Sequence, residues 1–157
     1  IMKVDEDLID DWTSVSYFRF GSDSSEGNPY NVINSICATS DNGLICTGET
    51  GSDPGDGSTH DMWLMKVNEN GTRQWEINID RGSLDQGLCV QQTGDLGYIA
   101  GGSRYDTTLH ASVFWLLKFD ESGEIEWERT FQGNGGGDSS IVSIRQTALI
   151  DAFHSSL

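Results

Sequence analysis

Short apolar runs alternate with glycine- and aspartate-containing turns along most of the chain. Residues 62–67 and 114–119 are apolar except for one lysine in each, and each run ends at a turn of the form Asn/Asp-Glu-x-Gly. A run of this length, rich in Trp, Val and Phe and bounded by a turn, is typical of a β-strand buried on both faces. No apolar pattern at helical spacing stands out, except a short one at the extreme C-terminus. The pattern predicts an all-β chain of short strands.

Two blocks of sequence recur along the chain. Residues 61–75 return as residues 113–127, 52 positions later, and residues 39–48 return as residues 93–102, 54 positions later. The first block shares six identities: Trp63, Lys66, Glu69, Gly71, Trp75 and Glu76 recur as Trp115, Lys118, Glu121, Gly123, Trp127 and Glu128. The second block begins a third time at residues 145–147 and then departs from the pattern after Thr147. Six identities at one offset are hard to explain by chance, so the sequence predicts a repeated structural unit.

Each repeat is predicted to hold four strands, which is the size of a β-propeller blade. The expected strands are residues 16–20, 32–38, 44–47, 62–67, 73–79, 88–92, 98–102, 114–119, 124–131 and 141–146. We therefore expect one propeller-like, all-β repeat region over residues 1–157, with about three repeats in an incomplete ring. Its expected parts are a partial blade at about 12–50, a full blade at about 61–104 and a partial blade at about 112–157. The four repeated tryptophans are expected to fill the space between blades.

A closed propeller needs at least four blades, and this chain holds fewer than three. Either the chain is a fragment of a larger propeller, or copies associate as a homo-oligomer to close the ring, or the repeats form an open array. The fragment is favoured, because an open array leaves strand edges that invite pairing with other chains.

The chain carries 25 acidic and nine basic residues, a formal net charge of −16. Nucleic acids and anionic lipids bind proteins through Lys and Arg, so we expect no nucleic-acid partner. No apolar stretch reaches the roughly 18 residues that span a bilayer, so we expect no membrane insertion. The acidic surface suits a cationic partner, a divalent metal or a salty environment, and it is also a simple means to solubility.

The pattern Asp-x-Trp-Leu-x-Lys-x-Asn/Asp-x-x-Gly-x-x-x-Trp, followed by Gln-Thr-x-Asp-x-Gly-Tyr-Ile-x-x-Gly, resembles the propeller-like repeats of secreted and cell-surface bacterial and archaeal proteins. It is also similar to the delta-60 class of bacterial repeats, and the likeness covers about residues 16–147. A fainter likeness links residues 120–127 to the blades of quinoprotein propellers, without a quinone site. The resemblance implies a β-propeller fold, an extracellular or cell-surface location, and a role in surface binding or as a structural spacer. The sequence starts at Ile1 with no signal peptide, which we interpret as a processed or excised piece.

The three cysteines do not form a disulfide framework. Cys37 and Cys46 flank the turn at residues 40–43, so in a hairpin they would lie opposite each other or one residue out of register. A cross-strand disulfide is one outcome, and two buried thiols are the favoured one.

Candidate chemistry is sparse. No Gly-x-Ser-x-Gly elbow or phosphate-binding loop is present, and we single out no catalytic residue. The three histidines (His60, His110 and His154) are scattered, and the first two are expected in exposed loops. The loop at residues 51–61 is rich in oxygen-bearing side chains and glycine, which suits Ca²⁺, so Asp53, Asp56 and Asp61 are candidate calcium ligands. A solvated acidic loop explains the same residues.

The leading hypothesis is a non-catalytic module for binding or scaffolding, with no cofactor beyond possible Ca²⁺ and with a protein or glycan as the ligand. The alternatives are part of a propeller enzyme, of hydrolase or quinoprotein type, whose site is completed by other blades, and a calcium-dependent adhesive module.

Overall fold

The computed structural model describes residues 30–51, 60–82, 84–133 and 137–146. Within these residues the chain forms eight β-strands and no helix. The strands are β1 (Tyr30–Ala38), β2 (Leu44–Gly51), β3 (His60–Val67), β4 (Arg73–Ile79), β5 (Asp85–Gln92), β6 (Tyr98–Asp106), β7 (Ala111–Phe119) and β8 (Ile125–Phe131). The expectation of an all-β chain of short strands is confirmed for this part of the chain.

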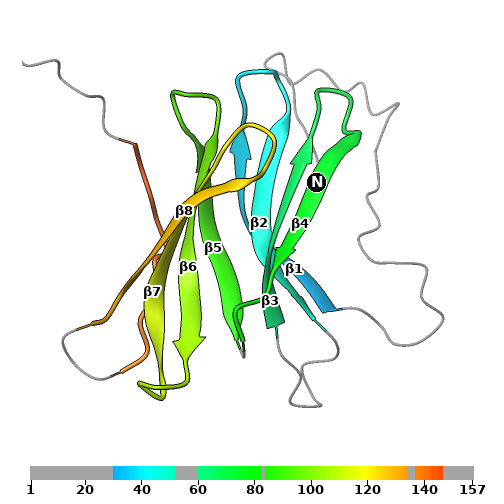
Figure 1. Ribbon diagram of the computed structural model, residues 1–157. Coiled ribbons are helices and arrows are strands. Elements are labelled where there is room, and N and C mark those ends of the chain that lie inside the picture. The colour runs from blue at the N-terminus through cyan, green and yellow to red at the C-terminus, as the bar shows by residue number, and fades with distance from the viewer. Residues whose placement is uncertain (1–29, 52–59, 83, 134–136, 147–157) are drawn as a thin grey trace, which may run out of the picture.

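The strands form two separate antiparallel sheets (Figure 1). The first sheet has the order β1-β2-β3-β4 and the second has the order β5-β6-β7-β8, so every hydrogen-bonded neighbour is also the next strand in sequence. The two sheets pack face to face, with β5 against β1, β2 and β3. The chain passes from one sheet to the other in the short connection between Ile79 and Asp85.

The two sheets have the same internal register. A bulge in the β1–β2 pairing lies between Ile33 and Ser35, and a bulge in the β5–β6 pairing lies at the equivalent place, between Gly87 and Cys89. The β3–β4 and β7–β8 pairings also shift register at equivalent residues. The repeat step falls from 54 to 52 because residues 52–59, between β2 and β3, outnumber their counterparts 106–111 by two. The sequence repeat is therefore a structural repeat of one whole sheet.

The sheet boundaries differ from the blade boundaries that the sequence suggested. Residues 61–104, expected as one blade, contribute β3 and β4 to the first sheet and β5 and most of β6 to the second. The reason is that a period fixes the length of a repeat but not where it starts. The Gly-rich segment at 52–59 resembled a boundary, whereas the chain changes sheets in the shorter connection after Ile79.

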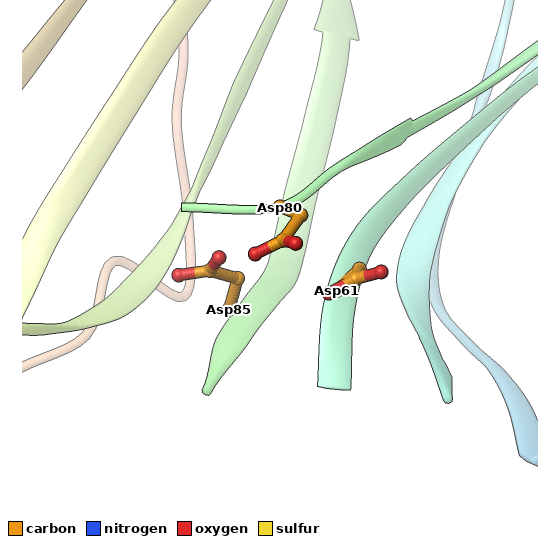
Figure 2. Close-up of side chains that lie close together, drawn as sticks. All are labelled: Asp61, Asp80 and Asp85. Carbon is orange, nitrogen blue, oxygen red and sulfur yellow. The ribbon is translucent and has the colours of Figure 1, made fainter. Parts of the chain in front are cut away.

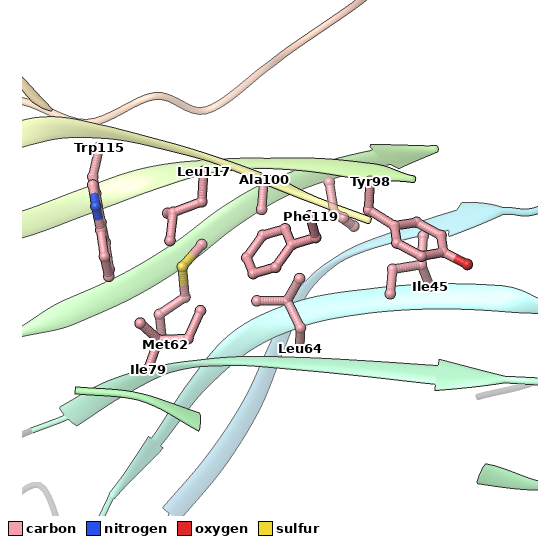
Figure 3. Packing of buried hydrophobic residues seen from close by; sticks show 10 residues of the cluster. Ile45, Met62, Leu64, Ile79, Tyr98, Ala100, Trp115, Leu117 and Phe119 are labelled. Atoms are coloured by element: carbon pink, nitrogen blue, oxygen red, sulfur yellow. The ribbon is translucent and has the colours of Figure 1, made fainter. Parts of the chain in front are cut away.

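The main hydrophobic core lies between the sheets (Figure 3). The first sheet contributes residues from β2, β3 and β4, and the second contributes residues from β5, β6 and β7. The buried members are Ile45, Met62, Leu64, Ile79, Val90, Tyr98, Ala100, Trp115, Leu117 and Phe119. Trp75 packs against this core, and its ring meets that of Tyr98 edge to face, with the ring centroids 5.5 Å apart. Burial of these side chains is the dominant force that holds the two sheets together.

Trp63 and Trp115 occupy equivalent positions in β3 and β7. Each is almost fully buried and pairs with a glycine on the neighbouring strand, Gly48 or Gly102. Alternation along the strand directs Trp115 into the core between the sheets and Trp63 to the opposite face of the first sheet, in a second apolar cluster with Cys46, Met65 and Val67. The same residue thus buries the same face of each sheet. The expected position between two sheets is confirmed for Trp115, whereas Trp63 lies on the face of the first sheet that points away from the second.

In each sheet, an ion pair links the turn between the first two strands to the third strand. Asp41, in the β1–β2 turn, accepts hydrogen bonds from Thr39 Oγ1 and Gly43 N and forms an ion pair with Lys66 Nζ at 2.7 Å. Asp95, in the β5–β6 turn, forms the equivalent pair with Lys118 Nζ at 3.0 Å. Because these residues recur in the sequence and make the same contacts, their repetition is explained by a shared structural role.

Residues 141–146 do not form the strand expected from the sequence. They run along the second sheet through isolated hydrogen bonds, from Ile141 N to Gly102 O and from Gln146 N to Gln91 Oε1. A strand requires a continuous ladder, and the sequence pattern that would supply the hairpin partner ends at Thr147. The expected strand at residues 16–20 lies outside the described residues.

The three cysteines are free thiols, as the favoured interpretation predicted for Cys37 and Cys46, although Cys46 is buried and Cys37 only half-buried. Ile36 pairs with Cys46, and Cys37 pairs with Ile45, so the two cysteines are one residue out of register. Cys37 packs against the core between the sheets, whereas Cys46 belongs to the cluster on the opposite face. Their side chains point to opposite faces of the sheet, which excludes a bond between them without backbone movement.

Candidate functional site

The most unusual polar site in the described residues lies where the chain passes between the two sheets. Asp80 Oδ1 accepts a hydrogen bond from Gly82 N at 2.8 Å, and Asp85 Oδ2 accepts one from Arg81 N at 2.6 Å. Gly82 has a φ of 137°, a conformation that side chains with a Cβ rarely adopt. The two carboxylates therefore shape the connection and are held at the junction by it.

Asp61, the second residue of β3, brings a third carboxylate to the same place (Figure 2). One oxygen from each of Asp61, Asp80 and Asp85 lies within 4.8 Å of the other two. Asp61 belongs to the first sheet, Asp80 follows its last strand, and Asp85 opens the second sheet. Three acidic groups, two from strands and one from the connection between the sheets, thus converge at one end of the interface between the sheets.

Asp85 is completely buried, with 0% of its surface exposed. Its Oδ1 atom has no hydrogen-bond partner among the described residues, and the same holds for Oδ1 of Asp61. Burial removes the carboxylate of Asp85 from water and raises its pKa, while the hydrogen bond from Arg81 N and the charge of Arg104 oppose this shift. Burial also raises the pKa of Asp61, and the nearby charge of Asp80 adds to the effect. The cluster is costly to charge fully without a cation.

The positive groups nearby only partly compensate. Arg104, on β6, lies opposite Asp85 of β5 in the strand register, yet its Nε atom is buried without a hydrogen-bond partner among the described residues. His60 Nδ1 lies 3.5 Å from Glu49 Oε2, and Gln86 Nε2 donates to the same oxygen at 2.8 Å. These side chains form a polar border around the junction.

The sequence pattern indicated one residue of this cluster as a metal ligand and did not indicate the other two. Asp61 was a candidate calcium ligand, whereas Asp53 and Asp56 lie outside the described residues. Asp80 and Asp85 were missed because they are 19 and 24 positions beyond Asp61. A comparison of the repeats carries the signal: the positions equivalent to Asp61, Asp80 and Asp85 are Val113, Gln132 and Ser139, so the acidic set is not part of the repeat.

The histidines and cysteines have structural surroundings. His60 opens β3 and is only 14% exposed, so the expectation of an exposed loop residue was wrong for it. Hydrogen bonds of the β2–β3 pairing extend to this residue and draw it into the sheet. His110 is exposed in a turn, as expected, and His154 lies outside the described residues. Burial raises the pKa of Cys46 to about 11 and also raises that of Cys89, so both remain thiols at neutral pH.

A shallow, open depression of about 410 Å³ lies beside β4 and is lined by Arg73, Glu76 and Asn78. Its lining is polar, and Glu76 Oε1 is already bonded to Trp63 Nε1 at 2.7 Å. An ion pair with Arg73 occupies the other oxygen of Glu76. The depression is thus a polar surface feature whose carboxylate has structural partners.

No family model matches the chain, and no curated protein is significantly similar to it. Among the residues that the structure describes, no helix could cross a membrane.

Proposed function

We propose that this chain is a non-catalytic repeat module of the β-propeller type, which serves as a binding or scaffolding surface outside the cell or at the cell surface. The observation that carries this proposal is a contact pattern between successive repeats. β5 packs against the first sheet in the same way as residues 137–146 pack against the second sheet. A stack that repeats its own interface is the arrangement on which propellers and related arrays are built.

Two pairs of contacts define this pattern. Ser40 N donates to Gln92 Oε1 at 2.7 Å, and 54 positions later Gly94 N donates to Gln146 Oε1 at 2.7 Å. Both bonds run from the first turn of one sheet to the end of the next repeat's first segment. Residues 137–146 therefore stand in the position of β5, one repeat further along the chain.

The packing between repeats is complementary as well. Gly87 lies so close to Thr47 that a Cβ on Gly87 would be 2.1 Å from Thr47 Oγ1. In the next repeat, Gly101 stands at the position of Thr47 and Ile141 at the position of Gly87, so the glycine is now on the other side of the contact. A Cβ on Gly101 would be 2.8 Å from Ile141 Cγ2. One small and one larger residue fill the same space in each interface. This exchange supports a conserved distance between successive repeats.

The outer face of the second sheet, which points away from the first sheet, is suited to a further sheet. Alternation along β6, β7 and β8 places five large apolar residues on it: Ile99, Phe114, Leu116, Trp127 and Phe131. They are half-buried or exposed, and Phe131 is 51% exposed. The occupant that fits this face is another four-stranded sheet of the same repeat, because the second sheet covers the equivalent face of the first.

A splice at the repeat boundary tests the proposal. Gln146 occupies the repeat position of Gln92, so replacing residues 147–157 by a copy of residues 93–131 would supply counterparts of β6, β7 and β8. Compared with the original chain, we expect the extended protein to have a higher urea midpoint of unfolding. Its free energy of unfolding should also fall more steeply with urea concentration, because a third sheet buries more surface. The matched control carries Trp115→Asp and Leu117→Asp in the added copy alone, which prevents packing. If the two extended proteins unfold alike, the added sheet does not stack and the proposal fails.

The non-catalytic part of the proposal has its own test. The protein is incubated with panels of glycan, peptide and alcohol substrates, and product formation is measured. We expect no turnover above a heat-denatured control. Turnover that a single carboxylate substitution abolishes would establish an enzyme and overturn this part.

A further inference from the structure

We propose that Asp61, Asp80 and Asp85 bind one Ca²⁺ ion at the junction between the two sheets. The carrying observation is the buried Asp85 side chain, whose unpartnered Oδ1 atom belongs to a carboxylate that converges with those of Asp61 and Asp80 (Figure 2). A carboxylate oxygen removed from water without a hydrogen bond is strongly destabilising unless a cation or a proton satisfies it.

The chemistry of the ligands selects a hard divalent cation. All three side chains offer carboxylate oxygen, without thiolate or imidazole among them, which favours Ca²⁺ or Mg²⁺ over zinc or copper. Two ligand oxygens on opposite sides of Ca²⁺ are about 4.8 Å apart, since each Ca–O bond is about 2.4 Å long. The oxygens of the cluster lie within 4.8 Å of one another, so only a small side-chain adjustment would bring all three to bonding distance of one Ca²⁺ ion. Magnesium has shorter bonds and stricter geometry, so it fits the wider separations less well.

The two sheets provide an internal comparison that separates this cluster from the needs of the fold. The junction between the second sheet and residues 137–146 corresponds to the junction between the two sheets, but it has Val113, Gln132 and Ser139 at the positions of the three aspartates. A junction of this repeat therefore forms without the acidic set. The three carboxylates belong to one junction only, and a role specific to that junction explains them.

The position of the site defines what the ion would do. Asp61 is held by β3 of the first sheet, and Asp85 is held by β5 of the second sheet. An ion bound to both would cross-link the sheets at one end of their interface. Because it would bind only the folded chain, it would also stabilise that chain by mass action.

The experiment is a Ca²⁺ titration of the full chain by isothermal calorimetry in chelator-treated buffer with about 0.15 M NaCl, which screens the acidic surface. We expect one site per chain, binding that weakens at acidic pH, and a melting temperature that rises by roughly 5 °C in millimolar Ca²⁺. A parallel Mg²⁺ titration should show weaker binding. Equal or tighter Mg²⁺ binding would overturn the assignment to calcium.

The test variant is Asp85→Asn, which keeps an oxygen for Arg81 N but removes the charge. We expect it to lose at least tenfold in Ca²⁺ affinity and to lose the thermal shift. The matched control is Glu69→Gln with Glu121→Gln, because both residues are exposed and lie in equivalent hairpin turns. The control removes more charge from the surface and should bind Ca²⁺ like the original chain. If the control weakens binding as much as Asp85→Asn, the ion is held by general surface charge and the site is wrong.

A measurement in chelator separates metal binding from misfolding. Without metal, Asp85→Asn should be at least as stable as the original chain, because it relieves an uncompensated buried charge. Asp80→Asn provides a second variant at an exposed residue and should also weaken Ca²⁺ binding. Undiminished Ca²⁺ binding by both variants would overturn the proposal, whatever their stability.

Discussion

Two equivalent faces of the molecule differ in what covers them. The face of the first sheet that meets the second carries Ile45, Met62 and Leu64, all at 0% exposure. The outer face of the second sheet carries their counterparts Ile99, Phe114 and Leu116, which are only half-buried. The equivalent residues are apolar on both faces, but only the face of the first sheet is covered by a neighbouring sheet. Apolar character at these positions therefore belongs to the repeat, and burial depends on whether a neighbouring sheet is present.

Leucine-to-alanine substitutions on the two faces should show the largest difference. Leu64 and Leu116 are the same residue at equivalent positions, so Leu64→Ala and Leu116→Ala remove the same atoms. We expect Leu64→Ala to cost about 3–4 kcal/mol in the free energy of unfolding, as for other buried leucines, and Leu116→Ala to cost about 1 kcal/mol. Urea denaturation followed by tryptophan fluorescence measures both. Equal costs would mean that the two faces are equally covered in solution.

The second largest difference in stability is expected between substitutions of the two buried tryptophans, Trp63 and Trp115. Trp63 Nε1 donates a hydrogen bond to Glu76, whereas Trp115 Nε1 is buried with no partner among the described residues. Glu128, the counterpart of Glu76, is instead within 3.3 Å of Arg81 in the connection between the sheets.

Replacement of each tryptophan by phenylalanine separates the hydrogen bond from the packing. Both changes remove similar volume, so Trp63→Phe should cost about 1–2 kcal/mol more than Trp115→Phe, because only the first loses a bond to a charged group. Thermal unfolding of the two variants gives the difference. A larger cost at Trp115 would show that its N–H group has a partner in solution.

A backbone comparison predicts a gain in stability. Asn42 and Leu96 stand at equivalent turn positions and both have positive φ, 60° and 69°. Asparagine tolerates this conformation, whereas leucine pays a steric cost for it. Leu96→Asn should therefore raise the free energy of unfolding by about 1 kcal/mol, and Asn42→Leu should lower it by a similar amount. Differential scanning calorimetry can detect both, and a loss on Leu96→Asn would contradict the turn geometry.

The smallest expected effect is the loss of stability at low pH that comes from the two hairpin ion pairs. The hydrogen bond from Lys66 holds the pKa of Asp41 at about 2, and the hydrogen bond from Thr93, followed by that from Lys118, does the same for Asp95. The folded-state pKa is below the ordinary 3.8, so each carboxylate stabilises the fold above about pH 4 and loses this contribution as the pH falls toward 2.

Asn substitutions at these two sites check that prediction. Because both carboxylates are largely exposed, Asp41→Asn and Asp95→Asn should each cost less than about 1 kcal/mol at pH 7. The differences from the original chain should shrink when urea unfolding is repeated near pH 2.5. A cost that stays constant between the two pH values would show that the charge is not responsible.

The fold was predictable to the extent that it depends on local pattern. Alternating apolar runs and Gly-containing turns determine the hairpins, and the 52-residue spacing of Trp63 and Trp115 indicates a repeated sheet. The start of each sheet was not predictable, because the chain changes sheets in a connection with no stronger turn signal than the hairpins have. The strand expected at 141–146 also failed, since a ladder needs a partner that local sequence does not provide.

The candidate site was predictable only in part. Asp61 stands in an oxygen-rich segment and was a candidate for that reason. Asp80 and Asp85 reach it only because the crossover between the sheets brings three distant positions together, which is a tertiary effect. The departure of all three from the repeat was visible in the sequence, but it gains meaning only once the equivalent positions are known from the strand pairing.

The connections at one end of the sheets show how such a protein can vary. Eight residues join Gly51 to His60, and six join their counterparts Tyr105 and Ser112, yet these residues pair in the same register. Length in this connection is therefore uncoupled from the strands that it joins, and residues 107–110 form an exposed turn. Insertions there, such as an epitope tag, should be accommodated without cost to folding. Over evolutionary time the same freedom would let these connections diversify while the strands that they join stay the same.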